Sequence, residues 1–562
     1  MVSAFRVDSL RDPTAALIEL YDDSASTADN FPRLVSDHFA HVFCSQDAYH
    51  EIPTLDVQHP PDAFPDRALV RFRAMVQDTS PSSEMYLATS PAGKCGGWGI
   101  DTGDPDGAQG VDYAHLRECS VLWAVSVPGE TEWCAEELNG PESHQERPPR
   151  PASTSSYQSQ HAYKYPHPSV PHIGLQVKTY DTDGAETLKS TDVVTFVGIL
   201  TTEPLSSDLD AASSEVPTLH VLFSRPHSQP LLSRPYPYLN TPESTADTAR
   251  SETAENTNPT RIRTALVKWI ADEALGGDAQ AAEWVLLSCV ARVQSRSPPL
   301  LPPSLTLAHF PAPPPSPSPS TGDADEGVLP NPTLSIVLAL LLPLTHTLAL
   351  SLPALNAGAF APESKHEDLH AGALQLPQGT VLLVTEGGVR EGQLVERGLL
   401  NVRALQEVMS TQTLVYAFPF SQFSFPTDIS CIVLGEGSKS AFFKTDLCVP
   451  LNAPHTPAAT SVLYKPASSI IRPPPAQLAA FRALILGART GRVAVSEETS
   501  EYIQSDFVRE RKRDTAVTSD DLIRRMTVAK LYALSMHETE LTVDVWERAK
   551  ALDQHRLALL AK

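Results

Sequence analysis

The chain has 562 residues, of which 41% are hydrophobic and 20% charged, so it is long enough to bury several hydrophobic cores. Its formal net charge of −24 opposes unspecific binding to nucleic-acid phosphates, and we expect no direct nucleic-acid partner. The seven scattered cysteines form no C-x-x-C pair, and Met1 to Leu20 has no apolar signal region, so free thiols and no secretory leader are expected.

The N-terminal part predicts helices followed by a β domain. Residues 1–62 hold apolar clusters at helical spacing, which predicts a helical region. Residues 68–78 alternate apolar and polar residues, which is typical of a half-buried strand. Further strands are predicted at 85–88, 121–127, 175–180, 193–200 and 218–223. Short strands separated by turns predict a small β-barrel over residues 63–224, with an oligonucleotide/oligosaccharide-binding (OB) shape as the leading candidate.

The chain has fifty prolines, and many of them cluster in stretches without hydrophobic periodicity. We interpret residues 141–171 as a disordered insertion, residues 225–259 as a linker, and residues 298–332 as a linker or surface loop. His161 and His167 fall in the first stretch and His172 directly follows it, and composition explains these three histidines better than metal binding.

The second half alternates helices and strands between residues 260 and 472, which predicts an α/β unit. Its expected helices are 262–275, 279–293 and 402–409, and its expected strands are 379–385 and 429–434. Residues 473–562 predict a helical end. There Thr518 and Asp521 form a capping box, Thr542 caps the last helix, and Trp546 faces inward as an anchor.

Residues 334–355 contain no charged side chain and are long enough to cross a bilayer. Pro343 and Pro353 interrupt this segment, and no aromatic or basic residues flank it. Residues 334–342 suit a buried helix and residues 344–352 alternate like a strand. We therefore expect a helix and a strand, with a membrane-anchored scaffold as the alternative.

The sequence motifs predict no catalytic, cofactor-binding or metal-binding site. The nearest match to a phosphate-binding loop is 435–440, but Val433 and Ser438 occupy its two glycine positions. Residues 381–386 resemble the magnesium-binding strand of such ATPases, with Thr385 in place of the aspartate. We interpret Glu386 as a solvated turn residue. Arg509 to Arg513 reads either as a solvated helix face or as a nuclear-import signal.

Several segments together resemble the mini-chromosome maintenance complex-binding protein family. They include VRFRAMVQDTSPSSEMYLA, KTYDTDGAETLKSTDVVTFVGIL, LHAGALQLPQGTVLLVTE, FSFPTDISCIVLGEGS and DFVRERKRDTAVTSDDLIRRMTVAKLYALS, at 70–88, 178–200, 369–386, 423–438 and 506–535. The resemblance implies an α/β multidomain fold with an N-terminal helical segment, an OB-like β-barrel, a degenerate AAA+-like α/β domain and a C-terminal helical lid.

The resemblance also implies a function. Family members associate with the mini-chromosome maintenance helicase subunits in the nucleus, and are implicated in their assembly, their unloading from chromatin and sister-chromatid cohesion. A non-catalytic adaptor without a cofactor, a membrane or a small-molecule substrate is therefore expected. A divergent AAA+-type ATPase is the alternative from another class.

Overall fold

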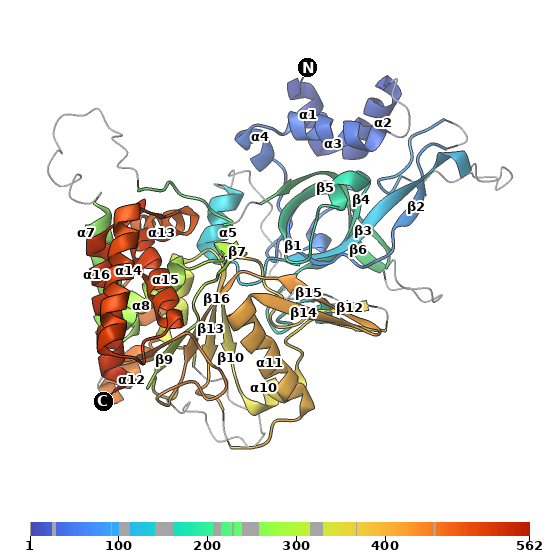
Figure 1. The fold of residues 1–562 in the computed structure, drawn as a ribbon. Coiled ribbons are helices and arrows are strands. Elements are labelled where there is room, and N and C mark those ends of the chain that lie inside the picture. The colour runs from blue at the N-terminus through green and yellow to red at the C-terminus, as the bar shows by residue number, and fades with distance from the viewer. Residues whose placement is uncertain are drawn as a thin grey trace, which may run out of the picture.

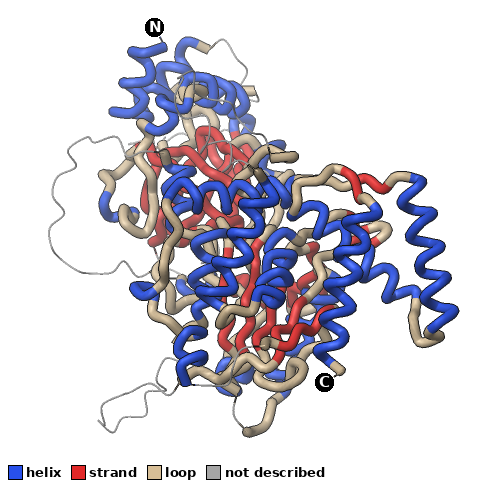
Figure 2. Tube along the Cα trace, turned by 90° about the vertical axis from the view of Figure 1, so that its left-hand side faces the viewer, coloured by secondary structure: helices blue, strands red, loops and turns tan. Residues whose placement is uncertain are grey.

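The computed structural model describes residues 2–24, 30–90, 93–100, 113–140, 159, 161–205, 215–227, 230–238, 258–314, 330–366, 368–389, 391–452 and 457–561. These residues form a mixed α/β protein with several sheets (Figures 1 and 2). The N-terminal helices lie over a β-barrel at one end, and an α/β unit with a helical C-terminal part forms the other end (Figure 1). All seven cysteines are free.

The predicted helical N-terminus is confirmed. Its helices are α1 (Val2–Arg11), α2 (Pro13–Asp23), α3 (Phe31–Val42) and α4 (Gln46–His50). Leu17, Val35 and Phe39 are fully buried and share one hydrophobic cluster with Trp98 and Phe223 of the β domain. These helices therefore pack on the barrel and do not form a separate core.

A β domain follows, and its main sheet closes on itself. The strands are β1 (Leu69–Asp78), β2 (Glu84–Leu87), β3 (Leu116–Ser126), β4 (Gly174–Thr179), β5 (Val193–Pro204) and β6 (Glu215–Pro226). β1 pairs with both β5 and β3, so the ring β1-β5-β6-β4-β3 is closed, and β2 is added at β3. The predicted strands are confirmed, whereas the OB shape stays a prediction. The short helices η1 (Pro61–Ala63), η2 (Tyr113–His115), α5 (Glu132–Asn139) and α6 (Thr182–Ala185) border this domain.

The first strand, β1, is buried on both faces, so the prediction of a half-buried strand is wrong. Val70 and Phe72 face the barrel core as predicted. Arg71 on the opposite face is also buried, because its guanidinium lies 5.1 Å from the Tyr49 ring of α4 and donates to the Asn139 carbonyl at the end of α5. The outer face of β1 is therefore covered by neighbouring helices.

Part of the predicted disordered insertion is ordered. Residues 161–171, including η3 (Ala162–Lys164), lie between the barrel and the α/β unit. Lys164 is 2% exposed and forms ion pairs with Asp78 of β1 and with Asp368. The prediction of disorder is wrong for these residues, because a polar segment can be buried where its charged side chains form ion pairs with opposite charges. Residues 141–158 and 160 lie outside the described residues.

The α/β unit is built on five parallel strands in the order β10-β13-β16-β9-β17. They are β9 (Leu305–Ala308), β10 (Thr345–Ala349), β13 (Thr380–Thr385), β16 (Ile429–Leu434) and β17 (Leu447–Pro450). Val381 and Leu383 face one core, whereas Leu382 and Val384 face another. Burial on both faces explains why the strand is apolar throughout.

Helices cover both faces of this sheet (Figure 1). α10 (Leu352–Ala357) and α11 (Glu396–Thr411) lie on one face, with the second sheet β12-β11-β14-β15 beside them. Its strands are β11 (Glu363–Lys365), β12 (Asp368–His370), β14 (Thr413–Phe418) and β15 (Ser421–Pro426). The predicted helix 402–409 and the strands at 379–385 and 429–434 are confirmed.

The apolar segment 334–355 is part of this core. α9 (Thr333–Leu341) ends before Pro343, and β10 pairs with β13 inside the sheet. The predicted helix and strand are confirmed, and the alternative of a membrane span at these residues is wrong. Within the described part of the chain, no helix has the length and apolar character to cross a bilayer.

Both remaining proline-rich stretches also contain packed residues. Within the expected loop 298–332, β8 (Pro299–Leu300) pairs with β7 (Ser295–Arg296), and all four residues of β9 are buried at the interior of the parallel sheet. Within the expected linker 225–259, Leu231 and Leu232 are buried. The prediction of a surface loop is therefore wrong for residues 299–308, because the side chains of Leu305 and Leu307 pack in the hydrophobic core of the sheet. Residues 239–257 and 315–329 lie outside the described residues.

The opposite face of the sheet packs against a group of helices that comes from two parts of the chain. They are α7 (Pro259–Ala274), α8 (Ala279–Val290), α12 (Pro457–Leu463), α13 (Pro475–Thr490), α14 (Glu497–Arg513), α15 (Ser519–Ser535) and α16 (Val543–Leu560), with η5 (Ala467–Ser469) and the short pair β18 (Ala494–Val495) and β19 (Glu540–Leu541). One hydrophobic cluster joins α7, α8, α9, α13, α15 and α16 to β9, β13, β16 and β17. The capping box at Thr518 and Asp521 and the cap at Thr542 are confirmed.

The basic run 509–513 forms the last turn of α14. Arg509, Arg511, Lys512 and Arg513 are exposed, as the interpretation of a solvated helix face requires. The interpretation as a nuclear-import signal and the predicted domain boundaries stay predictions.

Candidate functional site

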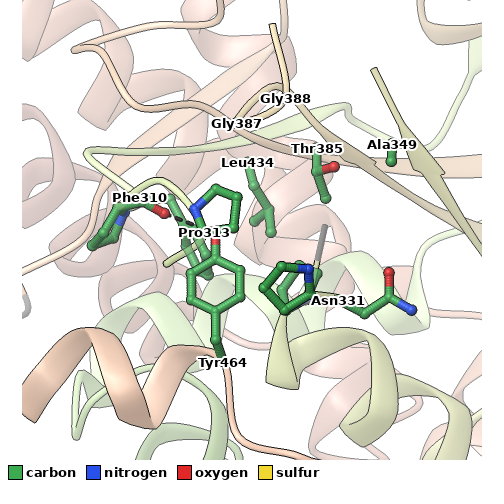
Figure 3. Close-up of a pocket in the computed structure, with 12 residues that line it drawn as sticks. Phe310, Pro313, Asn331, Ala349, Thr385, Gly387, Gly388, Leu434 and Tyr464 are labelled. Atoms are coloured by element: carbon green, nitrogen blue, oxygen red, sulfur yellow. Dashed lines mark hydrogen bonds between the residues drawn. The ribbon is translucent and has the colours of Figure 1, made fainter. Parts of the chain in front are cut away.

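The candidate site lies at the carboxyl edge of the parallel sheet. Since β9, β10, β13 and β16 run parallel, their last residues meet at one edge, where open α/β sheets generally bind ligands. Ala349, Thr385 and Leu434 end three of these strands and line one small cavity there (Figure 3). The two positions that resembled an ATPase magnesium strand, Thr385 and Glu386, are therefore at this edge.

The cavity is too small for a nucleotide. Its volume is about 20 Å³, room for roughly one water molecule, whereas small-molecule pockets typically measure about 300–1,000 Å³. Prolines from the two segments that flank residues 315–329 occupy the edge: Pro311, Pro313, Pro330 and Pro332. The proline-rich stretch thus fills the place where a ligand would bind.

Tyr464 holds the first of these segments in place. Its hydroxyl donates to the Pro311 carbonyl over 2.8 Å, and its ring packs edge-on against Phe310 (Figure 3). Burial raises the pKa of Tyr464, so the hydroxyl keeps its proton for this bond. On the other side, a side chain at Gly387 would place its Cβ 2.8 Å from Cδ of Pro313. The fit between the segment and the strand ends is therefore close.

The topology also identifies where a phosphate loop would have to lie. Such a loop joins a strand to the helix that follows it, and β9 and α9 are the strand and helix around this edge. The connecting residues 309–332 contain neither lysine nor arginine, so they offer no cation to neutralise phosphates. At the start of α9, Thr333 is fully buried and bonded to the Val462 carbonyl and the Lys465 amide.

The nearest sequence match, 435–440, has a different role. This segment follows β16, which is the fourth strand of the parallel sheet in chain order. The amide of Gly435 donates a hydrogen bond to the Leu307 carbonyl of β9 over 3.0 Å. His309 in turn donates to the Gly437 carbonyl over 2.9 Å. These residues connect neighbouring strands across the edge.

Glu386 is not a solvated turn residue, and that interpretation was wrong. It is 6% exposed. Its Oε1 accepts a hydrogen bond from the Ser440 hydroxyl over 2.5 Å, and its Oε2 accepts one from the Ala441 amide over 3.0 Å. Because both oxygens are engaged within the protein, the carboxylate is a structural clamp on the loop after β16.

Trp546 lies in the helical cluster and does not line the edge cavity. It is 2% exposed, and its Nε1 donates to Asp506 of α14 over 3.3 Å. Lys550, one turn further along α16, donates to the same carboxylate over 2.5 Å. Trp546 therefore joins α16 to α14 and to the core, and its role as the anchor of a lid stays a prediction.

His161, His167 and His172 are in folded surroundings. His172 stacks on Tyr165, and His167 stacks on His346 of β10, with 3.5 Å between ring centroids. Burial lowers the pKa of His167 to about 4 and that of His346 to about 3, so both rings are neutral near pH 7. No group of three or more His, Cys, Asp or Glu side chains in the described residues is placed to hold a metal ion.

Sequence reasoning missed Tyr464, Ser440 and the strand β9. One signal for β9 was present, because Leu305 and Leu307 alternate with small polar residues between the prolines. Ser440 and Tyr464 carry no comparable local signal, because their contacts are distant in sequence. Ser440 lies 54 residues from Glu386, and Tyr464 lies 153 residues from Pro311.

Comparison with known proteins gives a family. Residues 39–158 and 135–560 match the family model described as mini-chromosome maintenance replisome factor. The chain is 29% identical over 417 residues to a mini-chromosome maintenance complex-binding protein of Salmo salar, covering 68% of this chain and 61% of that protein. It is 24% identical to the protein of that name from Arabidopsis thaliana (96% and 95% covered) and 27% identical to the one from Homo sapiens (70% and 62% covered).

Proposed function

The chain belongs to the mini-chromosome maintenance replisome factor family, and we propose that it is a non-catalytic adaptor that binds mini-chromosome maintenance helicase subunits. The names of its relatives support this partner, since they are described as binding the mini-chromosome maintenance complex. We place the adaptor in the nucleus, where it would support assembly of the subunits, or their unloading from chromatin, in DNA replication and sister-chromatid cohesion.

We also propose that domains of this chain resemble domains of the helicase subunits that it binds. A closed five-stranded barrel with one added strand supports an OB-like domain. The parallel sheet, with a strand-loop-helix unit at β9 and α9 and a helical cover at 473–562, supports a degenerate AAA+-like domain with a lid. This chain would then present the same kind of surface through which neighbouring helicase subunits contact one another, while it forms no ATP site with them.

The filled carboxyl edge is the observation that carries the non-catalytic proposal. A cavity of about 20 Å³, the absence of lysine and arginine from 309–332, and a glutamate with both oxygens engaged all oppose nucleotide turnover. The alternative of a divergent AAA+-type ATPase requires this edge to open. A contact with the helicase would then be independent of ATP binding to this chain.

Two measurements test the proposal. The purified full chain should retain individual recombinant helicase subunits on an affinity column, and titration calorimetry with magnesium-ATP should show no dissociation constant tighter than roughly 1 mM, the weak end of specific binding. Retention of no subunit would remove the partner. Submillimolar ATP binding with turnover would establish the ATPase instead. Nuclear enrichment of the tagged chain tests the localisation separately.

A further inference from the structure

The hairpin β14–β15 presents aromatic side chains to solvent. Its turn contains Phe420, which is 102% exposed, and Phe423 of β15 is 54% exposed. The whole hairpin, residues 413–426, contains no Asp, Glu, Lys or Arg. In Figure 1 it lies between the barrel and α11. Large apolar side chains in such positions are a recognised mark of a protein-binding surface.

In the part of the chain that the structure describes, no strand pairs with the outer edge of β15. β15 is the last strand in the order β12-β11-β14-β15, and residues 421–424 are all exposed. A two-residue turn pairs Phe418 with Ser421, and hydrogen-bonded pairs then alternate along the hairpin. The amides of Gln422 and Ser424 therefore point away from β14. Natural edge strands are generally protected by charges, bulges or a covering element, and among the described residues Pro426, at the end of β15, is the one such feature on this edge.

The base of the hairpin is held rigidly between two parts of the fold. Tyr416 of β14 is 2% exposed, and its hydroxyl is hydrogen-bonded to Ser190 of the barrel domain over 2.8 Å and to Gln375 over 3.1 Å. Gln375 also donates to the Gln77 carbonyl of β1 over 2.8 Å. Phe425 packs on Tyr416 with 4.4 Å between ring centroids. A preorganised edge loses less entropy when a partner binds.

We propose that the β15 edge with Phe420 and Phe423 is a docking site for a helicase subunit, which adds an extended segment to β15 and covers both rings with apolar side chains. This inference rests on the proposed function and names the surface that performs it. Main-chain pairing would supply affinity, and pockets for the two rings would supply specificity.

A second copy of this chain suits the edge less well. Pairing two six-residue strands buries far less than the roughly 1,600 Å² of a typical stable interface. Two chains that each carry a net charge of −24 also repel one another. A helicase subunit, which by the proposed function contacts further surfaces of this chain, can use a small uncharged edge as one part of a larger interface.

The test measures affinity of the full chain for each immobilised helicase subunit. Phe420→Asp places a charge at a fully exposed site, and Ser424→Pro removes one outward amide, so both should weaken binding by about ten-fold or more. Ser424→Ala keeps the amide, and Met85→Asp changes an apolar residue of β2 that is 61% exposed. Both controls should bind within about two-fold of the wild type, as expected for changes outside the hot spot.

The outcomes separate the two proposals. If the wild-type chain binds a subunit and Phe420→Asp and Ser424→Pro bind equally well, the docking site is refuted while the adaptor function stands. If the wild-type chain binds no subunit, the adaptor function itself fails. Light scattering provides the remaining check, since a wild-type dimer that Phe420→Asp converts to a monomer would assign the edge to a second copy and overturn the inference.

Discussion

Oγ of Ser440 lies 2.5 Å from Oε1 of Glu386, to which it donates a hydrogen bond. This contact joins the loop after β16 to the end of β13, and the Ala441 amide strengthens it through the second carboxylate oxygen. The glutamate at the carboxyl edge of the sheet thus closes that edge.

Replacing Glu386 should therefore affect stability. Glu386→Ala leaves the Ser440 hydroxyl and the Ala441 amide without their acceptor, which costs about 1–3 kcal/mol for each buried group left unpaired. Thermal unfolding should show a lower midpoint, with a smaller decrease for Glu386→Gln, which retains one acceptor oxygen. An unchanged midpoint in both variants would refute the clamp.

Trp546 should be essential for the helical part of the fold. Truncating a buried aromatic residue typically costs about 3–5 kcal/mol, so Trp546→Ala should lower the unfolding midpoint and weaken retention of helicase subunits. Trp546→Phe keeps most of the packing but loses the hydrogen bond to Asp506, and should cost about 1 kcal/mol. The midpoints and subunit retention of the three proteins are compared directly. Equal loss in both variants would place the role of Trp546 in the hydrogen bond and not in its packing.

The stacked rings of His167 and His346 predict loss of stability in acid. Burial lowers the pKa of His167 to about 4 and that of His346 to about 3, below the ordinary value of about 6.5. Well above pH 6.5, for example at pH 7.5, both rings are almost entirely neutral in the folded and unfolded states. As pH falls from 6.5 towards 4, the unfolded chain binds protons that the folded chain excludes, so the free energy of unfolding decreases.

Unfolding midpoints at pH 7.5 and pH 5 measure this effect. The wild-type midpoint should fall between the two conditions, and it should fall less in His346→Phe, which keeps a ring but cannot titrate. His555→Phe, at an exposed position of α16, serves as the control and should behave like the wild type. If His346→Phe and the wild type lose the same number of degrees, the pair does not carry the acid sensitivity.

The proline-rich stretch divides into a required part and a part we expect to be dispensable for binding. Deleting residues 316–328 should leave retention of helicase subunits nearly unchanged, since the proposed contact uses folded surfaces. A deletion that begins at residue 303 removes β9 from the interior of the parallel sheet, and should prevent folding. Loss of binding in the shorter deletion, with an unchanged unfolding midpoint, would place the interaction in a linear motif.

Local patterns were sufficient for the elements that depend on neighbours in sequence. The capping box of Thr518 and Asp521 joins residues three positions apart, and the apolar run Val381 to Val384 is typical of a strand buried on both faces. The resemblance carried by ordered segments along the chain was likewise sufficient for the family, which the family comparison confirms.

Tertiary structure decided which polar and proline-rich residues are buried. Lys164 and β9 lie in stretches whose composition is typical of disorder, yet the lysine meets Asp78 and Asp368 and the strand meets β16 and β17. Glu386 ends a strand in a manner typical of an exposed turn, and only the return of the chain 54 residues later brings Ser440 to its carboxylate. Composition measures what a segment could bury alone, whereas burial depends on partners that the fold brings from far along the chain.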